Sequence, residues 1–435
     1  MKKLMLALAL VAANAAAAQA DPIELQWWHA MTSVNGDRIN KIAADFNASQ
    51  SEYKVVPVFK GSYAETMTAA IAAYRAGNAP DIVQVFEVGT ATMMAAKGAI
   101  KPVYQLMADA GEKFDPSAFL PAVTAYYSTP DGKMLSMPFN SSTPVVYWNK
   151  DEFKKAGMDP DKPPKTWPET FEAAKKLRAA GVPCGFTSAW VSWVQIENFS
   201  AWHNIPIATE ANGLGGLDTV LEINNPTVER HIANLAEAQK DKSFDYGGRT
   251  TEPEPKFISG DCGMIQDSSA AYGMFKSSAK FAWGVTQLPY YPDVKGAPQN
   301  SIIGGASLWV MGGKKPEQYK GIAKFFTYLS GVPVQKAWHE ATGYLPITKA
   351  AYEATKAEGF YEKNPGTEVA ILQMTGKPPT ENSRGLRFGN MVQIRDIIAE
   401  DLEGAFSGKM TAKAALGDAV SRGNALLRQF QKNVQ

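Results

Sequence analysis

The sequence lacks long hydrophobic runs beyond its first residues. A membrane-spanning helix needs about 18 or more consecutive apolar residues, and no stretch after residue 20 reaches that length in the chain of 435 residues. The early stretch is typical of a targeting signal: Lys2 and Lys3 precede the segment Leu4–Ala18, which is apolar except for Asn14, and small residues stand at Ala18 and Ala20. We therefore expect residues 1–20 to be a signal peptide that is cleaved after Ala20, and the remainder to be exported to the periplasm.

Runs of like charge are absent as well. No stretch of five or more like charges occurs, and 44 Lys and Arg residues stand against 43 Asp and Glu residues. A nucleic-acid-binding domain shows a basic excess or stripe, and a membrane-surface segment shows a polybasic cluster. The charge pattern therefore predicts that the protein binds neither nucleic acid nor a membrane surface.

Recognisable catalytic and metal-binding patterns are also missing. The 4 histidines are isolated, the GxSxG elbow and the P-loop are absent, and the SxxK match at 277–280 lacks its companion motifs. The histidines are His29, His203, His231 and His339. The sequence therefore predicts neither an enzyme nor a metal or cofactor site.

Cysteine is scarce. Cys184 and Cys262 are the only 2 cysteines, and each lies close to a strand that we expect in the same lobe. They can pair in an oxidising compartment, but a disulfide needs a specific geometry that spacing does not establish. Pairing and two free thiols both remain open.

The length of the chain indicates two domains. With 45% hydrophobic and 20% charged residues, its composition is that of a globular protein, and a single core rarely grows beyond about 300 residues. We expect an N-terminal lobe over 21–139, completed by about 307–343. The C-terminal lobe is expected over 140–306, completed by about 344–435.

An alternation of strands and helices predicts the fold class. Strands are expected at 23–28, 54–59 and 82–86, with amphipathic helices between them. This βαβαβ order predicts an α/β protein whose lobes each contain a mainly parallel sheet flanked by helices. Ligands of such sheets gather at the carboxyl ends of the strands, where Glu87 is expected to stand.

The stretch 135–150 is the expected link between the lobes. Its apolar runs, 137–139 and 145–148, are separated by Asn140–Pro144, of which the first four carry hydrogen-bonding side chains. Buried hydroxyl groups need hydrogen-bond partners, so these residues suit a crossing that offers donors to a ligand in a cleft; an ordinary loop is the other interpretation. With similar segments at 302–311 and 343–348, they predict a hinge of three crossings.

Several of these segments resemble a known family. The stretches 77–81, 145–150 and 343–346 are similar to the extracytoplasmic solute-binding proteins of ABC importers, which have the two-lobed maltose-binding-protein fold. Four further segments resemble the members of this family that bind sn-glycerol-3-phosphate. They are 84–94, 138–144, 197–202 and 297–300.

The resemblance implies a set of ligand-binding residues. Arg395, the serines, the tyrosines and the Gly305 amide would supply donors to a phosphate dianion, and Glu87 would accept hydrogen bonds from glycerol hydroxyls. The implied lining residues are Tyr63, Glu87, Ser142, Ser268, Gly305, Tyr344 and Arg395, with Trp190 and Trp193 as walls. For any one aromatic side chain, core packing is the common role.

One position departs from the family pattern. Asp267 directly precedes Ser268 where the family has small neutral residues, and an acid that pointed inward would oppose phosphate. Because successive strand residues point to opposite faces, we expect Asp267 to face away from Ser268.

The resemblance also implies the function. The protein is expected to be a monomeric, cofactor-free periplasmic receptor that captures sn-glycerol-3-phosphate, or a glycerophosphodiester, and delivers it to an ABC permease. An oligosaccharide receptor of the same fold is the alternative. A secreted hydrolase and a structural adhesin are the alternatives from other classes.

Overall fold

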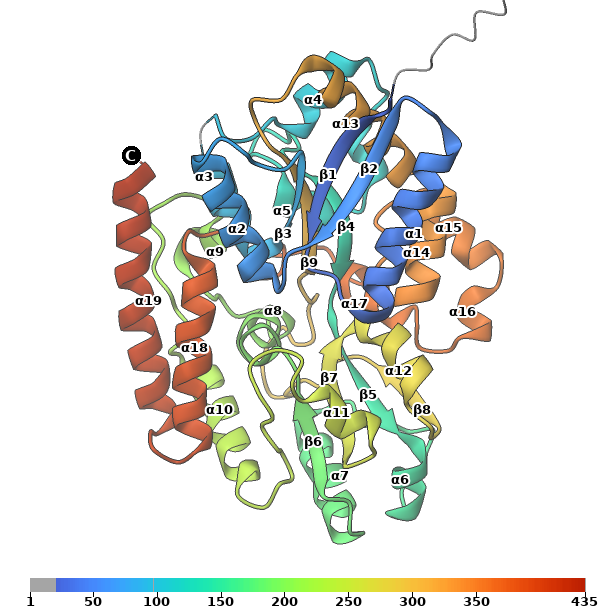
Figure 1. Ribbon diagram of the computed structural model, residues 1–435. Coiled ribbons are helices and arrows are strands. Elements are labelled where there is room, and N and C mark those ends of the chain that lie inside the picture. The colour runs from blue at the N-terminus through green and yellow to red at the C-terminus, as the bar shows by residue number, and fades with distance from the viewer. Residues whose placement is uncertain (1–20, 97, 435) are drawn as a thin grey trace, which may run out of the picture.

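The structure, a computed structural model, describes residues 21–96 and 98–434. The predicted signal peptide therefore lies outside the described residues. The chain forms two β-sheets, an upper and a lower one, each flanked by helices (Figure 1). The two-lobed α/β fold predicted from the sequence is confirmed, whereas the exact lobe boundaries remain a prediction.

The upper sheet has five strands in the order β2-β1-β3-β9-β4. Its first three strands come from the predicted βαβαβ unit, and the periodic residues Ile39, Ile42 and Phe46 of α1 are buried as predicted. The strands are β1 Ile23–His29, β2 Tyr53–Phe59, β3 Ile82–Phe86, β4 Met137–Ser142 and β9 Gly304–Val310. The accompanying helices are α1 Ser33–Ser49, α2 Tyr63–Arg75, the short helix η1 Glu87–Gly89, α3 Thr90–Ala95, α4 Val103–Ala110, η2 Pro116–Ala118, α5 Pro121–Tyr127, α13 Pro316–Leu329 and α14 Val332–Thr342.

The lower sheet has four strands in the order β6-β7-β5-β8. Helix α7 begins at the predicted capping box, in which Thr166 and Glu169 bond each other's backbone. The strands are β5 Pro144–Asn149, β6 Cys184–Ser188, β7 Cys262–Ser268 and β8 Trp283–Thr286. The helices are α6 Lys150–Lys155, α7 Trp167–Ala179, the π-helix η3 Trp193–Asn198, α8 Phe199–Trp202, α9 Thr209–Gly213, α10 Pro226–Gln239, α11 Glu254–Ile258, η4 Ser269–Ala271 and α12 Tyr272–Ser278.

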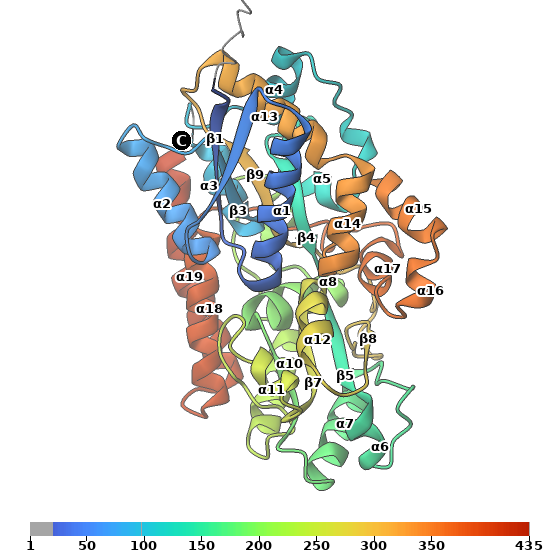
Figure 2. The same ribbon diagram turned by 45° about the vertical axis from the view of Figure 1, so that its right-hand side comes forward.

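The C-terminal part of the chain is helical. Helices α18 and α19 stand side by side along both halves of the molecule (Figures 1 and 2). The hydroxyl of Thr411 accepts the N–H of Ala414, which agrees with the predicted cap of the last helix. These helices are α15 Lys349–Ala357, α16 Phe360–Lys363, α17 Val369–Thr375, α18 Met391–Phe406 and α19 Ala412–Val434.

Most strands of each sheet run in the same direction, as predicted, and one strand in each sheet is reversed. Strand β9 is antiparallel to both β3 and β4, and β5 is antiparallel to both β7 and β8. The reason lies in the crossings: β9 and β5 enter their sheets from the hinge, whereas β3, β4, β6 and β7 run toward it. The carboxyl ends of these four strands therefore face the junction of the two halves.

The crossing from β4 to β5 is more regular than predicted. The polar residues do not interrupt the strand, because Ser141 and Ser142 pair with Gly305 and Gly304 of β9. Only Thr143 separates the two strands, and its hydroxyl donates to the hydroxyl of Ser301 at 2.6 Å. Figure 2 shows β4 and β5 following one another from the upper into the lower half.

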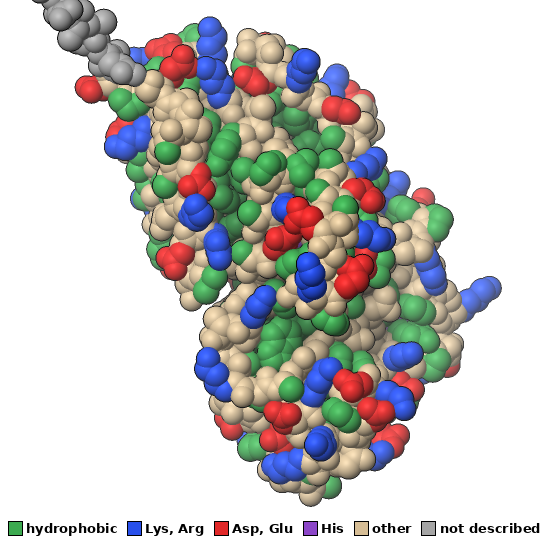
Figure 3. All heavy atoms as spheres, turned by 90° about the vertical axis from the view of Figure 1, so that its right-hand side faces the viewer, with side chains coloured by type: hydrophobic (Ala, Val, Ile, Leu, Met, Phe, Trp, Pro, Cys, Tyr) green, Lys and Arg blue, Asp and Glu red, His purple; other side chains and the backbone are tan. Residues whose placement is uncertain are grey.

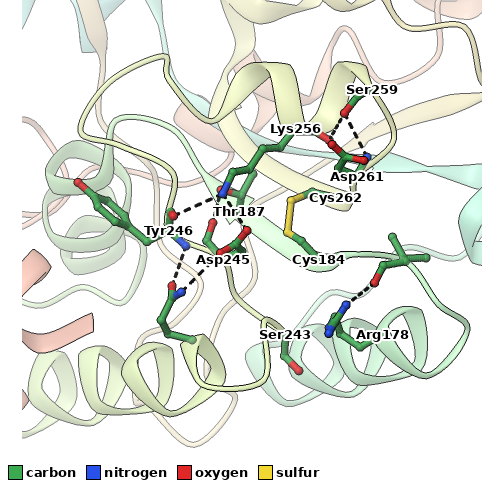
Figure 4. The surroundings of a disulfide bond; sticks show 12 residues. Arg178, Cys184, Thr187, Ser243, Asp245, Tyr246, Lys256, Ser259, Asp261 and Cys262 are labelled. Carbon is green, nitrogen blue, oxygen red and sulfur yellow. Dashed lines mark hydrogen bonds and ion pairs between the residues drawn. A yellow bond between two sulfur atoms is a disulfide. The ribbon is translucent and has the colours of Figure 1, made fainter. Parts of the chain in front are cut away.

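The two cysteines form a disulfide. Cys184 and Cys262 stand opposite each other at the first residues of the neighbouring strands β6 and β7 (Figure 4). The bond closes a separation of 78 residues, and a loop of this size is worth about 4 kcal/mol in the chain-entropy account. It joins the ends of the strands that lie away from the hinge.

The surface of the molecule also shows the division into two halves. On the face shown in Figure 3, a hollow with hydrophobic side chains lies where the upper and lower halves meet. None of the helices within 21–96 and 98–434 combines the length and apolar character needed to cross a bilayer.

Candidate ligand-binding site between the two sheets

The strand directions bring most of the predicted site residues to the junction of the two halves. Glu87 directly follows β3, Ser142 ends β4, Ser268 ends β7, and Trp190 follows β6 after one residue. Gly305 is the second residue of β9, which starts at the same junction. We call the predicted binding residues together the interlobe site.

Arg395 lies within a buried group of charges. Its Nε and Nη2 atoms each donate to the Glu197 carboxylate at 2.7 Å, and Nη2 also donates to Glu87 at 2.5 Å. The Glu87 and Glu197 side chains are 4% and 1% exposed, and that of Arg395 is 15% exposed. We call these three residues the Arg395 cluster.

The Arg395 cluster spans both halves. Arg395 belongs to α18, which packs on α10 of the lower half and also touches η1 of the upper half. Glu87 is the first residue of η1, and Glu197 lies in η3 of the lower half. The guanidinium therefore bridges carboxylates that belong to different halves of the molecule.

Burial and charge oppose one another within this cluster. Burial raises the pKa of Glu87, Arg395 pulls it down, and the neighbouring Glu197 pushes it up again, so that it stays above its ordinary value. Burial alone would lower the pKa of Arg395, but the two carboxylates outweigh it and raise that pKa. Arg395 therefore stays charged at every accessible pH.

A chain of polar groups connects the tyrosines of the site. The amide of Asn140 donates to the hydroxyl of Tyr63 at 2.8 Å and accepts from Gln84 at 2.8 Å. Tyr63 also shares a hydrogen bond with Tyr344, and burial raises the pKa of both phenols. Both hydroxyls therefore stay neutral and can act as donors. The ring of Tyr63 stacks on Phe86 at 5.4 Å between centroids.

The paired glycines of β9 fit their neighbours closely. Gly305 has φ of 92°, and a Cβ atom there would lie 1.8 Å from the carbonyl oxygen of Asn140. A Cβ atom on Gly304 would lie 2.4 Å from the indole of Trp193. Only glycine satisfies both the backbone conformation and the close approach at 305.

The two tryptophans lie together in the lower half. Trp190 packs against the cluster that contains Trp193 and Trp202, and its backbone is left-handed, with φ of 49°. The N–H of Trp190 donates to the carbonyl of Thr250 at 2.9 Å, which fixes this turn. Non-glycine residues in this conformation are uncommon and are held by their surroundings.

Ser268 and Asp267 separate as adjacent strand residues do. The Ser268 hydroxyl accepts the N–H of Ala270 at 3.1 Å and caps η4. The Asp267 side chain is fully buried and accepts the N–H of Ser268 at 2.6 Å, and the carboxyl of Glu254 is close enough to shift its pKa. We call Glu254 and Asp267 the acid pair.

A cavity of about 340 Å³ lies outside the interlobe site. Helix α3, the loop after α9, residues 387–389 and helix α19 line it, and none of the predicted site residues does. Among the described residues, no group of three or more His, Cys, Asp or Glu side chains could hold a metal ion.

Comparison with protein families identifies the chain. The family model for bacterial extracellular solute-binding proteins matches residues 41–368. The chain belongs to this family.

Individual members of the family are similar over nearly the whole length. The sn-glycerol-3-phosphate-binding periplasmic protein UgpB of Brucella abortus is 54% identical over 427 residues, which are 98% of this chain and 97% of that protein. The protein of the same name from Pectobacterium atrosepticum is 53% identical over 430 residues, or 99% and 96% of the two chains.

Solved structures of other proteins share the fold. The UgpB protein of Mycobacterium tuberculosis, in complex with glycerophosphocholine, superposes with a TM-score of 0.77 at 19% identity and covers 94% of this chain and 99% of its own. Maltose-bound MalE3 of Thermotoga maritima gives 0.73 at 18% identity, with 94% and 100% covered. At these identities the likeness concerns the two-lobed fold.

The structure adds two residues that sequence reasoning did not place in the site. Glu197 lay within a segment used for the family resemblance, and no local pattern around it indicated that it is buried. Asn140 was noted only as part of the crossing, although it links Gln84 to Tyr63. Arg395 was expected to face an anion, and here two carboxylates hold it.

Proposed function

We propose that the protein is the periplasmic receptor of an ABC importer and captures sn-glycerol-3-phosphate, or a glycerophosphodiester with the same core. One observation carries the proposal: nearly full-length identity of 53–54% to proteins named for binding sn-glycerol-3-phosphate. The periplasmic location of these relatives also supports the periplasm as the location of this protein. Cleavage of the first 20 residues and delivery to a membrane permease complete the proposal.

The donors of the interlobe site support an anionic polyol as the ligand. Arg395 has five N–H groups, and the three hydrogen bonds to Glu87 and Glu197 use Nε and Nη2. The two N–H groups of Nη1 have no partner among the described residues, so they can donate to a phosphate oxygen. Charged hydrogen bonds of this kind are the strong ones.

The acceptors of the site support recognition of the glycerol part. Glu87 is held on one side by Arg395, and its carboxylate is an acceptor for hydroxyl groups rather than for a phosphate. The neutral phenols of Tyr63 and Tyr344 and the hydroxyl of Ser142 add neutral donors nearby. These groups belong to elements of the upper half, and Ser268 ends β7 of the lower half; contributions from two halves suit the closure of two lobes around a ligand.

Isothermal titration calorimetry of the purified protein tests the proposal. We expect binding of sn-glycerol-3-phosphate or glycerophosphocholine and no binding of maltose. The reverse pattern would favour an oligosaccharide receptor, which the aromatic side chains Trp190 and Trp193 would also suit. Recovery of unchanged ligand after long incubation tests the proposal that the protein binds without catalysis.

A further inference from the structure

The acid pair differs from the other buried carboxylates near the site. Asp267 is 0% exposed, its Oδ1 atom accepts the N–H of Ser268 at 2.6 Å, and its Oδ2 atom has no backbone, hydroxyl, amide or cationic donor among the described residues. The group that meets Asp267 is the carboxyl of Glu254. Two carboxyl groups can hydrogen-bond only when a proton lies between them, because ionised carboxylates are acceptors alone.

The surroundings of the acid pair supply no compensating cation. Glu252 precedes α11, the phenol of Tyr147 comes from β5, and Tyr344 follows α14. No Lys, Arg or His side chain is among the groups that shift the pKa of either acid within the described chain. A second negative charge would therefore be buried without a partner, which is costly.

The neighbouring groups do not titrate near neutral pH. Burial raises the pKa of Tyr147 and of Tyr344, so both phenols stay protonated. His339 bonds the Tyr344 carbonyl through Nδ1, and burial lowers its pKa to about 4, so this ring stays neutral above that pH. Of these neighbouring groups, only the acid pair can gain or lose a proton near neutral pH.

We propose that Glu254 and Asp267 share one proton beside Ser268, and that loss of this proton weakens the binding of anionic ligands at the interlobe site. The proposal rests on the proposed function, because it concerns the affinity of the same site. When the proton leaves, a second negative charge arises one residue from Ser268 and within electrostatic range of Tyr344. Coulomb repulsion through the protein interior then opposes the phosphate.

The direction of the pKa shifts agrees with a proton held at neutral pH. Burial raises the pKa of Glu254 to about 7, and burial together with Glu254 raises the pKa of Asp267 well above its ordinary value. The two groups titrate as a pair, so the proton belongs to both. The pair therefore loses its proton as the pH rises from weakly acidic to weakly alkaline.

The test uses a ligand whose own charge is constant. A phosphate monoester such as sn-glycerol-3-phosphate changes charge near pH 6, whereas the phosphodiester of glycerophosphocholine does not. Between about pH 6 and about pH 8 we expect its affinity for the unaltered protein to fall roughly three- to tenfold, the scale of one linked proton. Calorimetry in buffers of different ionisation enthalpy should also show proton uptake on binding above neutral pH.

Two variants and one control sharpen the test. Asp267→Asn and Glu254→Gln each remove the shared proton and should make the affinity independent of pH over this range. Asp401→Asn is the matched control, because Asp401 is also buried with a pKa raised to about 6, yet its partner is Arg422 of α19. This variant should keep the pH dependence of the unaltered protein.

The outcomes separate the two proposals. Binding of glycerophosphocholine with equal affinity at both pH values, or an equal slope in the Asp267→Asn and Glu254→Gln variants, would overturn the shared proton and leave the proposed function intact. A protein that binds neither sn-glycerol-3-phosphate nor glycerophosphocholine at any pH would overturn the proposed function and the inference with it. Glu254→Gln provides the same test if Asp267→Asn fails to fold.

Discussion

Two buried groups of carboxylates border the interlobe site, and they are balanced in different ways. In the Arg395 cluster a guanidinium lies between Glu87 and Glu197. In the acid pair no cation approaches Glu254 or Asp267 within the described residues, so a proton has to take its place. The guanidinium of the first group keeps its charge at every accessible pH, whereas the charge of the acid pair depends on the pH.

The difference follows from what each position can reach. Arg395 extends from α18, the helix that stands beside both halves, so its long side chain can reach η1 and η3 together. The acid pair lies between α11 and the end of β7 in the lower half, where the nearest titratable neighbours are phenols and another acid. The fixed charge of Arg395 suits a permanent contact between the two halves. The shared proton instead makes the charge of Glu254 and Asp267 depend on the pH.

Removal of the guanidinium should have the largest effect. Arg395→Ala leaves two buried carboxylates without a cation, and breaking such a group typically costs about 3–5 kcal/mol of the free energy of unfolding. Affinity for phosphate ligands should fall by about 2 kcal/mol or more, the scale of a lost charged hydrogen bond. Urea unfolding and calorimetry measure the two effects.

Arg422→Ala is the control for this variant. Arg422 also contacts three carboxylates, but its side chain is 38% exposed. Exposed ion pairs contribute about 1 kcal/mol or less. Equal losses in the two variants would contradict a special role of burial at Arg395, and unaltered ligand affinity in Arg395→Ala would show that the anion binds elsewhere.

Neutralising one carboxylate of the Arg395 cluster should have an intermediate effect. Two carboxylates and one guanidinium leave one net negative charge, and Glu197→Gln removes it. We expect a loss of about 1.5–3 kcal/mol in stability, because charged hydrogen bonds to Arg395 are lost. The affinity for glycerophosphocholine should rise, since Arg395 is then less neutralised by the protein.

The same titration with Glu400→Gln is the control. Glu400 pairs with Arg422 through a side chain that is 56% exposed, so this change should leave ligand affinity unaltered. A fall in affinity of the Glu197→Gln variant would mean that Glu197 serves mainly to position Arg395.

The pH dependence of stability should distinguish the acid pair from the Arg395 cluster. Both acids of the pair have pKa values raised in the folded protein, so the folded state binds more protons than the unfolded state above about pH 5. Stability contributed by the shared proton is then present at low pH and is lost as the pH rises through the folded pKa, by at most about 1.4 kcal/mol per pH unit and proton.

Asp267→Asn should remove this loss. The variant should match the unaltered protein near pH 5 and exceed its free energy of unfolding by about 1–2 kcal/mol near pH 8. Urea unfolding at a series of pH values measures the difference. A variant that is less stable than the unaltered protein at both pH values would show that Asp267 acts as an ordinary hydrogen-bond acceptor.

Much of the fold could be predicted from the sequence because local patterns specify it. The spacing of Ile39, Ile42 and Phe46 and the capping box at Thr166 depend on neighbours within a few residues, and both were confirmed. The reversed direction of β5 and β9 was not predicted, since it depends on the point at which the chain re-enters each sheet. No local pattern carries that information.

The residues of the candidate site show the same difference between local and long-range information. Glu87 was accessible to sequence reasoning because the end of the strand 82–86 could be located, whereas Ser142 was included through the family resemblance. The contacts of Arg395 with Glu197 and of Asp267 with Glu254 join segments that are far apart in the chain. Burial shifts the pKa values of these groups, and the burial of a side chain depends on the fold of the whole chain.

The smallest effect is expected at the partly exposed member of the acid pair. Glu254→Gln replaces the shared proton by an amide N–H that can donate to an ionised Asp267, so stability near pH 6 should stay within about 1 kcal/mol of the unaltered protein, the net worth of one hydrogen bond. The pH dependence of unfolding should flatten as in Asp267→Asn, and Glu252→Gln, an exposed neighbour on the same segment, should leave it in place. If Glu252→Gln flattens the curve equally, the general negative charge of this segment and not a shared proton distinguishes the two groups of carboxylates.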